Sequence, residues 1–322
     1  MKSYKQLTYE QRCQIYVLKQ SNLAQQAIGG AIGASQSAVS RELKCNTGER
    51  GYRYQQAQRK SEARRSEATK ALKMTPGMIN LIESKLSLKW SPEQISGWLL
   101  AERGERLSTE TIYQHIWADK GAGGSLYCHL RRQGKAYQSR GKTTAGRGHI
   151  KNRVSIDERP SIVDDKGRLG DWEIDLVIGK GHSGALVTIV ERQTSFSVSA
   201  RINDKSAATV TAATIALLKP FKSAVHTITA DNGKEFAYHE QMTSALDAPV
   251  YFADPYSSWQ RGLNENTNGL LRQYWPKSTD FKKISANEVA AVIIHLNDRP
   301  RKKLGYKTPA DLMMKHMAAI AA

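Results

Sequence analysis

The chain has 322 residues, 40% of them hydrophobic, which is enough for one to three domains that each bury a core. Its formal net charge of +18 and its pI near 9.8 favour a polyanionic partner, and nucleic acid is the first candidate. Residues 1–150 hold 25 Lys and Arg against 11 Asp and Glu, and the remainder holds 23 against 19, so we expect the first half to bind the polyanion.

Three cysteines without a C-x-x-C pair indicate neither a disulfide framework nor a zinc knuckle, and they fit a reducing compartment. The first residues contain no apolar segment of the kind that a secretory signal needs. The longest apolar stretch, residues 289–294, is far too short to cross a bilayer. We therefore expect a cytoplasmic protein without a membrane partner.

Residues 8–45 predict three helices. Thr8 and Gln11 form a capping box that starts the first helix. We expect a second helix over about 23–32, a turn at Gly33, and a third helix that begins at the good N-cap Ser35 and runs to Lys44. A helix, a tight glycine turn and a second helix make the helix-turn-helix layout.

The exposed face of the third predicted helix carries side chains that can bond to base edges and phosphates. They are Gln36, Ser37, Ser40, Arg41 and Lys44. The alternative is an ordinary three-helix packing unit, and the charge of this half favours DNA binding. We take residues 1–50 as a helix-turn-helix DNA-binding domain.

Residues 51–75 are rich in Arg, Lys, Gln and Ala and predict a basic helical linker. Residues 76–119 predict a second helical module that resembles another helix-turn-helix. In it, Ser91-Pro-Glu-Gln94 is a capping box with proline at the tolerated first helical position, Gly104 ends that helix and Ser108 starts the next. Because the charge of this module is mixed, a DNA reader and a structural module both stay open.

From Lys120 to Ile156 the chain has nine basic residues and no acidic ones, with seven glycines through Gly148. This composition predicts a basic Gly-rich linker or DNA-tracking arm over 120–158, and a disordered tether is the alternative. Its candidate DNA contacts are Arg131, Arg132, Lys135 and Arg140.

From about residue 159 the pattern changes to short strands and helices. We expect strands over 172–178, 185–191, 196–202, 225–230 and 250–252, and helices over 206–218, 259–274 and 285–297. This succession of strands and helices predicts an α/β domain with a mixed sheet, as in RNase H-like domains, with a C-terminal helix. The predicted fold is therefore multidomain, with all-α modules followed by an RNase H-like catalytic core over 159–322.

Two aspartates stand out by their context in this domain. Asp175 lies mid-strand, and the alternation of faces places it beside Asp171 and Glu173. Carboxylates in a central strand are costly unless they coordinate something. Asp231 ends the fourth predicted strand, at the position where α/β sheets commonly bind ligands, and Asn232 belongs to the sharp turn that follows.

The third acidic position, Glu265, lies on a predicted helix with Asn268 one turn further on. Three carboxylates can hold two hard cations about 3.5–4 Å apart, which stabilise the attacking and leaving oxygens of a phosphodiester. Oxygen-only ligands favour Mg²⁺ or Mn²⁺ over zinc. We predict that Asp175, Asp231 and Glu265 bind two Mg²⁺ ions, which Mn²⁺ could replace. Glu173 is the expected auxiliary acid or rival ligand, and Asn232 and Asn268 are further auxiliary residues.

The sequence resembles the insertion-sequence-thirty family of DDE transposases over nearly its whole length. The catalytic blocks that carry the resemblance are residues 170–179, 229–236 and 251–269, and the 33 residues between Asp231 and Glu265 match the family's spacing. The other similar blocks are residues 296–302 with 308–309, 40–43 and 90–95.

The resemblance implies a bacterial, element-encoded enzyme whose catalytic triad is Asp175, Asp231 and Glu265. Such an enzyme binds terminal inverted repeats through its N-terminal domain, cuts at the element ends and transfers the 3′-hydroxyl ends to target DNA. Synapsis of two ends suggests a homodimer or a higher homo-oligomer on double-stranded DNA, associated with the nucleoid when bound. Arg272, just beyond the glutamate block, is a further candidate DNA contact.

Two other functions compete with this interpretation. A DNA-binding regulator with an inactive catalytic domain is disfavoured because the triad is intact. A nuclease of RNase H type that cuts without joining is disfavoured because two DNA-binding modules precede the catalytic domain.

Overall fold

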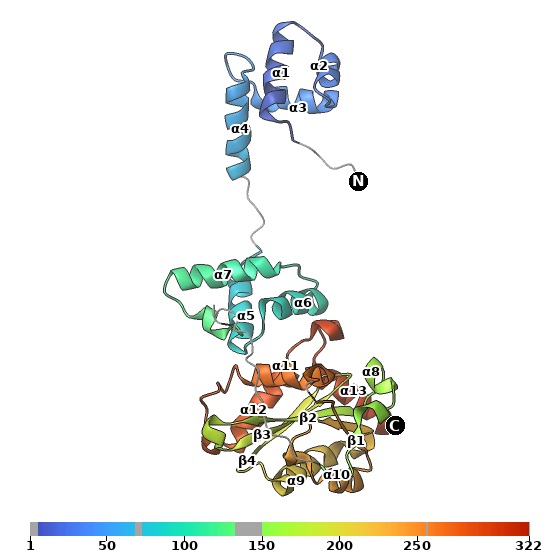
Figure 1. Cartoon of the computed structure of the whole chain (residues 1–322). Coiled ribbons are helices and arrows are strands. Elements are labelled where there is room, and N and C mark those ends of the chain that lie inside the picture. The colour runs from blue at the N-terminus through green and yellow to red at the C-terminus, as the bar shows by residue number, and fades with distance from the viewer. Residues whose placement is uncertain (1–5, 68–72, 133–149, 256, 322) are drawn as a thin grey trace. The chain divides into compact units, whose positions relative to one another are not determined.

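The computed structural model describes residues 6–67, 73–132, 150–255 and 257–321. The chain divides into two compact units, Met1–Lys73 and Met74–Ala322 (Figure 1). The first unit is helical, and the second combines a helical module with a six-stranded sheet. Among the described residues, no helix is both long and apolar enough to span a membrane.

Over its described residues 6–67, the N-terminal unit contains four helices, of which the first three form the predicted helix-turn-helix arrangement. They are α1 (Tyr9–Gln20), α2 (Gln25–Ala31), α3 (Gln36–Asn46) and α4 (Tyr54–Glu67). The capping box of Thr8 and Gln11 starts α1, and the Ser35 side chain accepts the amide of Ala38 at the start of α3. Gly33 closes the turn with a φ of +66°, a conformation that glycine adopts without strain.

A buried ion pair joins the helices of this unit. Arg12 on α1 donates to Glu42 on α3 across 2.9 Å, and both side chains are almost inaccessible. Arg12 also donates to Gln58 and Ser61 on α4, and the hydroxyl of Tyr52 donates to Glu42. Burial, together with the charge of Glu42, raises the pKa of Tyr52 far above its usual range. Each buried charge therefore has partners, as a stable interior requires.

The second unit begins with a module of three helices. They are α5 (Pro76–Ser87), α6 (Pro92–Arg103) and α7 (Thr109–Gly121), followed by the 3-10 helix η1 (Leu126–His129). The predicted capping box at Ser91 is confirmed, and Gly104 ends α6 in the left-handed conformation. This module has its own hydrophobic core, which includes Ile82, Ile95 and Ile112.

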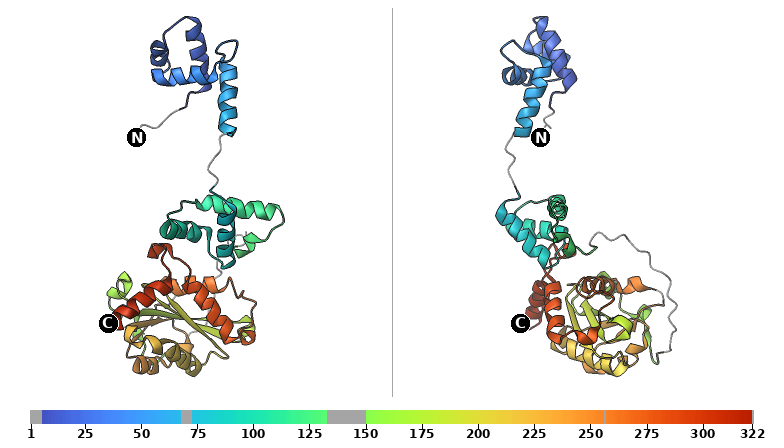
Figure 2. Two further views of the ribbon diagram at one scale, coloured as in Figure 1. Left: turned by 180° about the vertical axis from the view of Figure 1, so that it is seen from behind. Right: turned by 90° about the vertical axis from the view of Figure 1, so that its left-hand side faces the viewer.

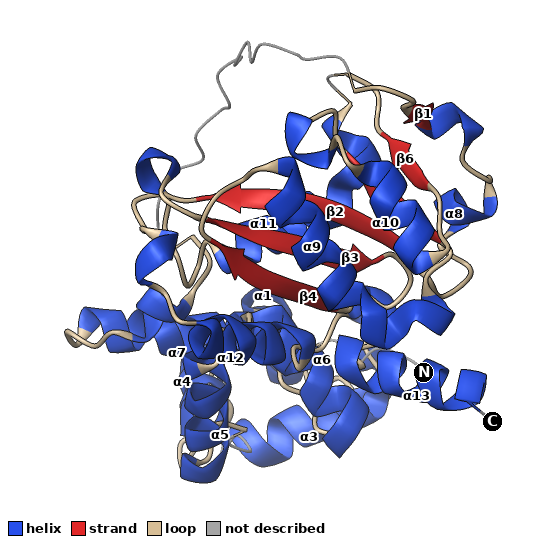
Figure 3. Cartoon of the chain, turned by 90° about the horizontal axis from the view of Figure 1, so that it is seen from below, coloured by secondary structure: helices blue, strands red, loops and turns tan. Residues whose placement is uncertain are grey.

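A mixed sheet forms the centre of the second unit (Figure 3). Its strands are β1 (Val154–Ser155), β2 (Asp171–Ile178), β3 (Ala185–Glu191), β4 (Ser197–Ile202), β5 (Thr227–Ala230) and β6 (Val250–Phe252). The spatial order is β1-β6-β5-β2-β3-β4. The β2–β3 and β3–β4 pairs are antiparallel, whereas β5 and β6 continue the sheet in parallel from β2. The predicted mixed sheet is confirmed.

Helices cover both faces of this sheet (Figures 1 and 2). They are α8 (Ile162–Asp165), α9 (Ala207–Leu218), α10 (His239–Leu246), α11 (Gly262–Leu271), α12 (Ala286–Asn297) and α13 (Pro309–Ala321). Trp172 and Ile174 of β2 pack in one core with α9 and α10. Val177 packs in a second core with α11 and α12. Alternation along β2 therefore directs Glu173 and Asp175 toward α11.

Several segments differ from the sequence-based expectation, among them α10 and α13, for which no helix was expected. Residues 154–155, placed in the predicted linker, form strand β1, because pairing with β6 gives their main-chain groups partners at the sheet edge. The helix expected over 259–274 is a 3-10 helix, η6 (Ser258–Arg261), followed by the shorter α11. The main chain of Arg261 is not helical (φ −125°, ψ 39°), which separates the two segments.

Candidate active site

The two predicted catalytic aspartates lie at the same end of neighbouring strands. In the parallel β2–β5 pair, Glu173 is opposite Thr229. Two residues further along each strand are Asp175, still within β2, and Asp231, directly after β5. Because the strands run in the same direction, this register places the two carboxylates side by side.

The guanidinium of Arg261 bridges these two carboxylates. One of its nitrogens lies 3.4 Å from Oδ1 of Asp175 and another 3.3 Å from Oδ2 of Asp231. Burial raises the pKa of Asp175 above its ordinary value; the charge of Arg261 opposes this shift and the charge of Asp231 adds to it. The two carboxylates therefore concentrate negative charge in a partly desolvated site, where the guanidinium of Arg261 compensates it.

Asn268 and Thr188 hold Asp175 in place from two sides. Asn268 on α11 donates its side-chain amide to Oδ2 of Asp175 across 2.9 Å. Thr188, which pairs with Asp175 across the β2–β3 ladder, donates to Oδ1 of Asn268 across 3.0 Å. Asn268 was expected near the site, whereas Thr188 was missed. The register of the β2–β3 hairpin is the signal that could have identified it.

Glu265 is half-buried on α11, one turn before Asn268. The helix packs against both β2 and β3, so it belongs to the face that carries Asp175. Across the described residues, no group of three or more His, Cys, Asp or Glu side chains is placed to hold a metal ion. Convergence of Glu265 with the two aspartates on metal ions therefore stays a prediction.

Glu173, expected to be an auxiliary acid or a rival ligand, has other partners. Its side chain is 1% exposed and lies 2.7 Å from Arg192. Its second oxygen accepts the main-chain amide of Asn264, in the first turn of α11, across 3.0 Å. Asp171 is likewise paired, with Arg168 and Thr227. These contacts favour a positioning role for Glu173, and its role as an auxiliary acid or rival ligand stays a prediction.

Asn232 stabilises the turn after β5. Its side-chain amide donates to the carbonyl of Ala253 across 2.6 Å, and its oxygen accepts a hydrogen bond from Arg153. The amide of Gly233 donates to Oδ1 of Asp231 across 2.8 Å. The amide of Gly233 thus orients the Asp231 carboxylate, and Asn232 supports the turn that carries it.

The candidate DNA contacts of α3 lie on an accessible face of the helix. Gln36, Ser37, Arg41 and Lys44 are exposed, and Ser40 is half-buried. In the second unit, Arg131 and Arg132 are exposed as well. Lys135 and Arg140 lie outside the described residues.

Arg272 points into the protein instead. Its guanidinium donates to the carbonyl of Ile178 across 2.8 Å and to that of Pro276 across 3.3 Å. It thereby connects the end of α11 to the end of β2. These bonds favour a structural role over the predicted DNA contact.

Comparison with known proteins agrees with this architecture. Residues 166–258 match the integrase core domain, and residues 3–46 match a helix-turn-helix domain family. The transposase for insertion sequence element IS4351 of Bacteroides fragilis is 46% identical over 95% of this chain and 94% of its own length. The transposase InsI for insertion sequence element IS30A of Escherichia coli K12 is 36% identical over 97% and 84%.

Among solved structures, the catalytic core domain of BIV integrase aligns with a TM-score of 0.38 and 18% identity, over 47% of this chain and 98% of that chain. The fold assignment rests on the sheet topology and the integrase core match. A helix-turn-helix domain followed by an integrase core with paired aspartates defines a DDE transposase, a polynucleotidyl transferase of a class that generally uses divalent metal ions. The chain belongs to the IS30 family of transposases.

Proposed function

We propose that this transposase binds the terminal inverted repeats of an insertion sequence through its N-terminal unit. It then cleaves at the element ends and transfers the 3′-hydroxyl ends to target DNA. The exposed polar and basic face of α3 supports the binding step. Because two ends must meet, we propose that it acts on double-stranded DNA as a homodimer or higher homo-oligomer, in the bacterial cytoplasm.

The bridging position of Arg261 is the observation that carries the catalytic part of the proposal. Two carboxylates from neighbouring strands share one cation, which offsets the burial penalty on the charge of Asp175. An all-oxygen set of this kind suits hard divalent cations. The residues present therefore fit the metal ions that the family uses.

In the proposed mechanism, Asp175, Asp231 and Glu265 hold two divalent cations, Mg²⁺ or in its place Mn²⁺. When bound, these ions stabilise the charge that develops on the attacking and leaving oxygens of a phosphodiester. Asn268 and Thr188 keep the Asp175 carboxylate oriented, and the amide of Gly233 does so for Asp231. A divalent cation held by both aspartates would compete with Arg261 for their oxygens.

A strand-transfer assay tests the proposal. The full chain is incubated with terminal-repeat DNA, a target plasmid and Mg²⁺, beside Asp231→Asn and the matched control Asp165→Asn, whose side chain is exposed on α8. We expect joined products from the wild type and the control, and binding without products from Asp231→Asn. Cleavage without joining would favour a nuclease. Binding without cleavage by the wild type would overturn the proposal.

A further inference from the structure

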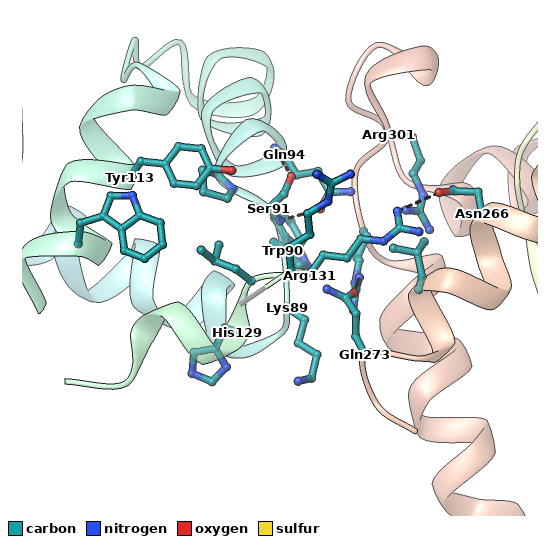
Figure 4. Close-up of a pocket in the computed structure, with 16 residues that line it drawn as sticks. Lys89, Trp90, Ser91, Gln94, Tyr113, His129, Arg131, Asn266, Gln273 and Arg301 are labelled. Atoms are coloured by element: carbon teal, nitrogen blue, oxygen red, sulfur yellow. Dashed lines mark hydrogen bonds between the residues drawn. The ribbon is translucent and has the colours of Figure 1, made fainter. Parts of the chain in front are cut away.

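A basic cleft lies inside the second unit, between the helical module and the catalytic core (Figure 4). It has a volume of about 600 Å³. Five of its lining side chains are basic and none is acidic among the described residues. The basic residues are Lys89, Arg131 and Arg132 from the module and Arg299 and Arg301 from the core.

The basic groups of this cleft lower one another's pKa. Burial and the charge of Arg299 lower the pKa of Lys89, and burial followed by the charges of Arg299 and Arg131 lowers the pKa of Arg301 to about 10. The pKa of His129 is lowered by burial and by Lys89. Like charges gathered in a partly dehydrated place are costly unless an anion joins them.

Two of the guanidinium groups retain unused donors. The Nε atoms of Arg299 and Arg301 are buried and have no hydrogen-bond partner among the described atoms. Arg299 is only 1% exposed; its other nitrogens donate to Gln273 and to the hydroxyl of Tyr274. Lys89 and Arg299 lie 5.2 and 5.4 Å from the ring centre of Tyr274. Neutral groups thus hold these cations in position without neutralising them.

We propose that this cleft binds the phosphodiester backbone of the DNA strand that enters the active site. The proposal rests on the proposed function, and it identifies the residues that hold the substrate beside the catalytic helix. Arg131 reaches across the cleft and donates to Asn266, the residue after Glu265, across 3.1 Å (Figure 4). A backbone bound by Arg131 is therefore held against α11.

Polymeric DNA fits the cleft better than a small free anion does. The volume of about 600 Å³ is in the range of sites that hold drug-sized ligands, well above the need of one phosphate ion. Tyr113 and Trp117 line the module wall, and aromatic rings of this kind stack with bases or sugars beside a basic groove. Phosphate contacts of this type carry no sequence preference.

The salt dependence of DNA binding tests this site. Affinity of the full chain for terminal-repeat DNA and for unrelated DNA is measured by fluorescence anisotropy over a range of salt concentrations. For Lys89→Gln and Arg301→Gln, we expect weaker binding to both DNAs and a salt slope reduced by about 1 for each lost phosphate contact. The matched control Lys219→Gln removes an exposed charge after α9 and should leave the slope unchanged.

Thermal unfolding checks that each variant is folded, and Lys89→Gln, in a half-buried position, keeps the test valid if Arg301→Gln is unstable. Unchanged slopes in folded variants would overturn the inference. If, in addition, millimolar inorganic phosphate raised the melting temperature of the wild type, the cleft would be a site for a small anion. If the substitutions reduce the salt slope but the wild-type protein joins no DNA ends, the result would support DNA binding in the cleft and overturn the proposed function.

Discussion

The carboxylate of Glu173 accepts the main-chain amide of Asn264 across 3.0 Å and so connects strand β2 to the first turn of α11. The first amides of a helix lack partners within it, and a carboxylate there is a favourable acceptor. The same side chain pairs with Arg192 in the interior. Because α11 carries Glu265 and Asn268, Glu173 controls where those side chains lie relative to Asp175.

Substitution Glu173→Gln should therefore destabilise the protein. It preserves the shape of the side chain but removes the carboxylate that lies 2.7 Å from Arg192, which keeps only the longer contact of 3.5 Å with the exposed Asp164. Breaking a buried ion pair typically costs about 3–5 kcal/mol, and the remaining contact with Asp164 places the expected loss at the lower end of that range. Urea unfolding measures the loss, and strand transfer should fall with it. The exposed Glu240→Gln should change stability by less than about 0.5 kcal/mol. Equal stability of the two variants would show that the pair has no such role.

Arg261→Gln should change the response of the protein to divalent ions. Without the guanidinium, Asp175 and Asp231 face each other with no bridging cation, so the metal-free melting temperature should fall. The upward shift that Mg²⁺ or Mn²⁺ produces should exceed the wild-type shift, because no guanidinium has to be displaced. Differential scanning fluorimetry with and without EDTA measures both, with the exposed Arg106→Gln as control. A smaller metal-induced shift than in the wild type would contradict the bridging role.

Lys303 should make stability depend on alkaline pH. The residue as a whole is exposed, but its ammonium group lies 3.5 Å from the carbonyl of Arg192. Desolvation of this group, with a smaller effect of Lys166, lowers the pKa of Lys303 from 10.5 to about 8 in the folded protein. Between these values the unfolded chain binds the proton and the folded chain does not, so this residue makes stability rise as pH increases from about 8 to 10.5. Lys303→Gln should flatten that rise, measured as unfolding free energy against pH. Lys307→Gln, at another exposed lysine, is the control. If it flattened the rise of unfolding free energy with pH as much as Lys303→Gln does, the assignment to Lys303 would be refuted.

Trp259 should contribute to DNA binding. Its side chain is 74% exposed in the 3-10 helix η6, two residues before Arg261 and three before α11. Stacking of a base on an aromatic side chain is worth about 1–3 kcal/mol, so Trp259→Ala should weaken DNA binding by about 5- to 150-fold. Anisotropy titration measures the change, and Tyr238→Ala, which removes another exposed ring, is the control. Equal affinities of the two variants would exclude a contact at Trp259.

Gly97 should be required for packing of α6 against the C-terminal segment. A Cβ at this position would overlap the ring of Tyr306. Gly97→Ala should cost about 1–3 kcal/mol, the typical penalty of overpacking. In Gly97→Ala/Tyr306→Ala the clash is absent, so the unfolding free energies of the four proteins should not be additive. Additive changes in unfolding free energy would mean that the added methyl group and the ring do not clash.

Much of the fold could be predicted from the sequence because its signals are local. The capping boxes at Thr8 and Ser91 and the turn at Gly33 depend on residues within four positions of each other. Strand alternation and the turn after residue 230 likewise identified Asp175 and Asp231 as candidate metal ligands. Asn268 was expected one turn from Glu265 from helical spacing alone.

Only the tertiary structure decided which partners the acidic residues contact. Glu173 and Asp175 lie on one face of the same strand and look alike in the sequence. Glu173 meets an amide 91 positions away, whereas Asp175 meets Asn268 and shares Arg261 with Asp231. The break before α11 and the basic cleft also depend on residues far apart in the chain. Local periodicity carries no information about such partners, because they come together only when the sheet and its helices pack. The sequence by itself therefore determined which residues could form the site, and the packing of α11 on β2 decided which carboxylates face it.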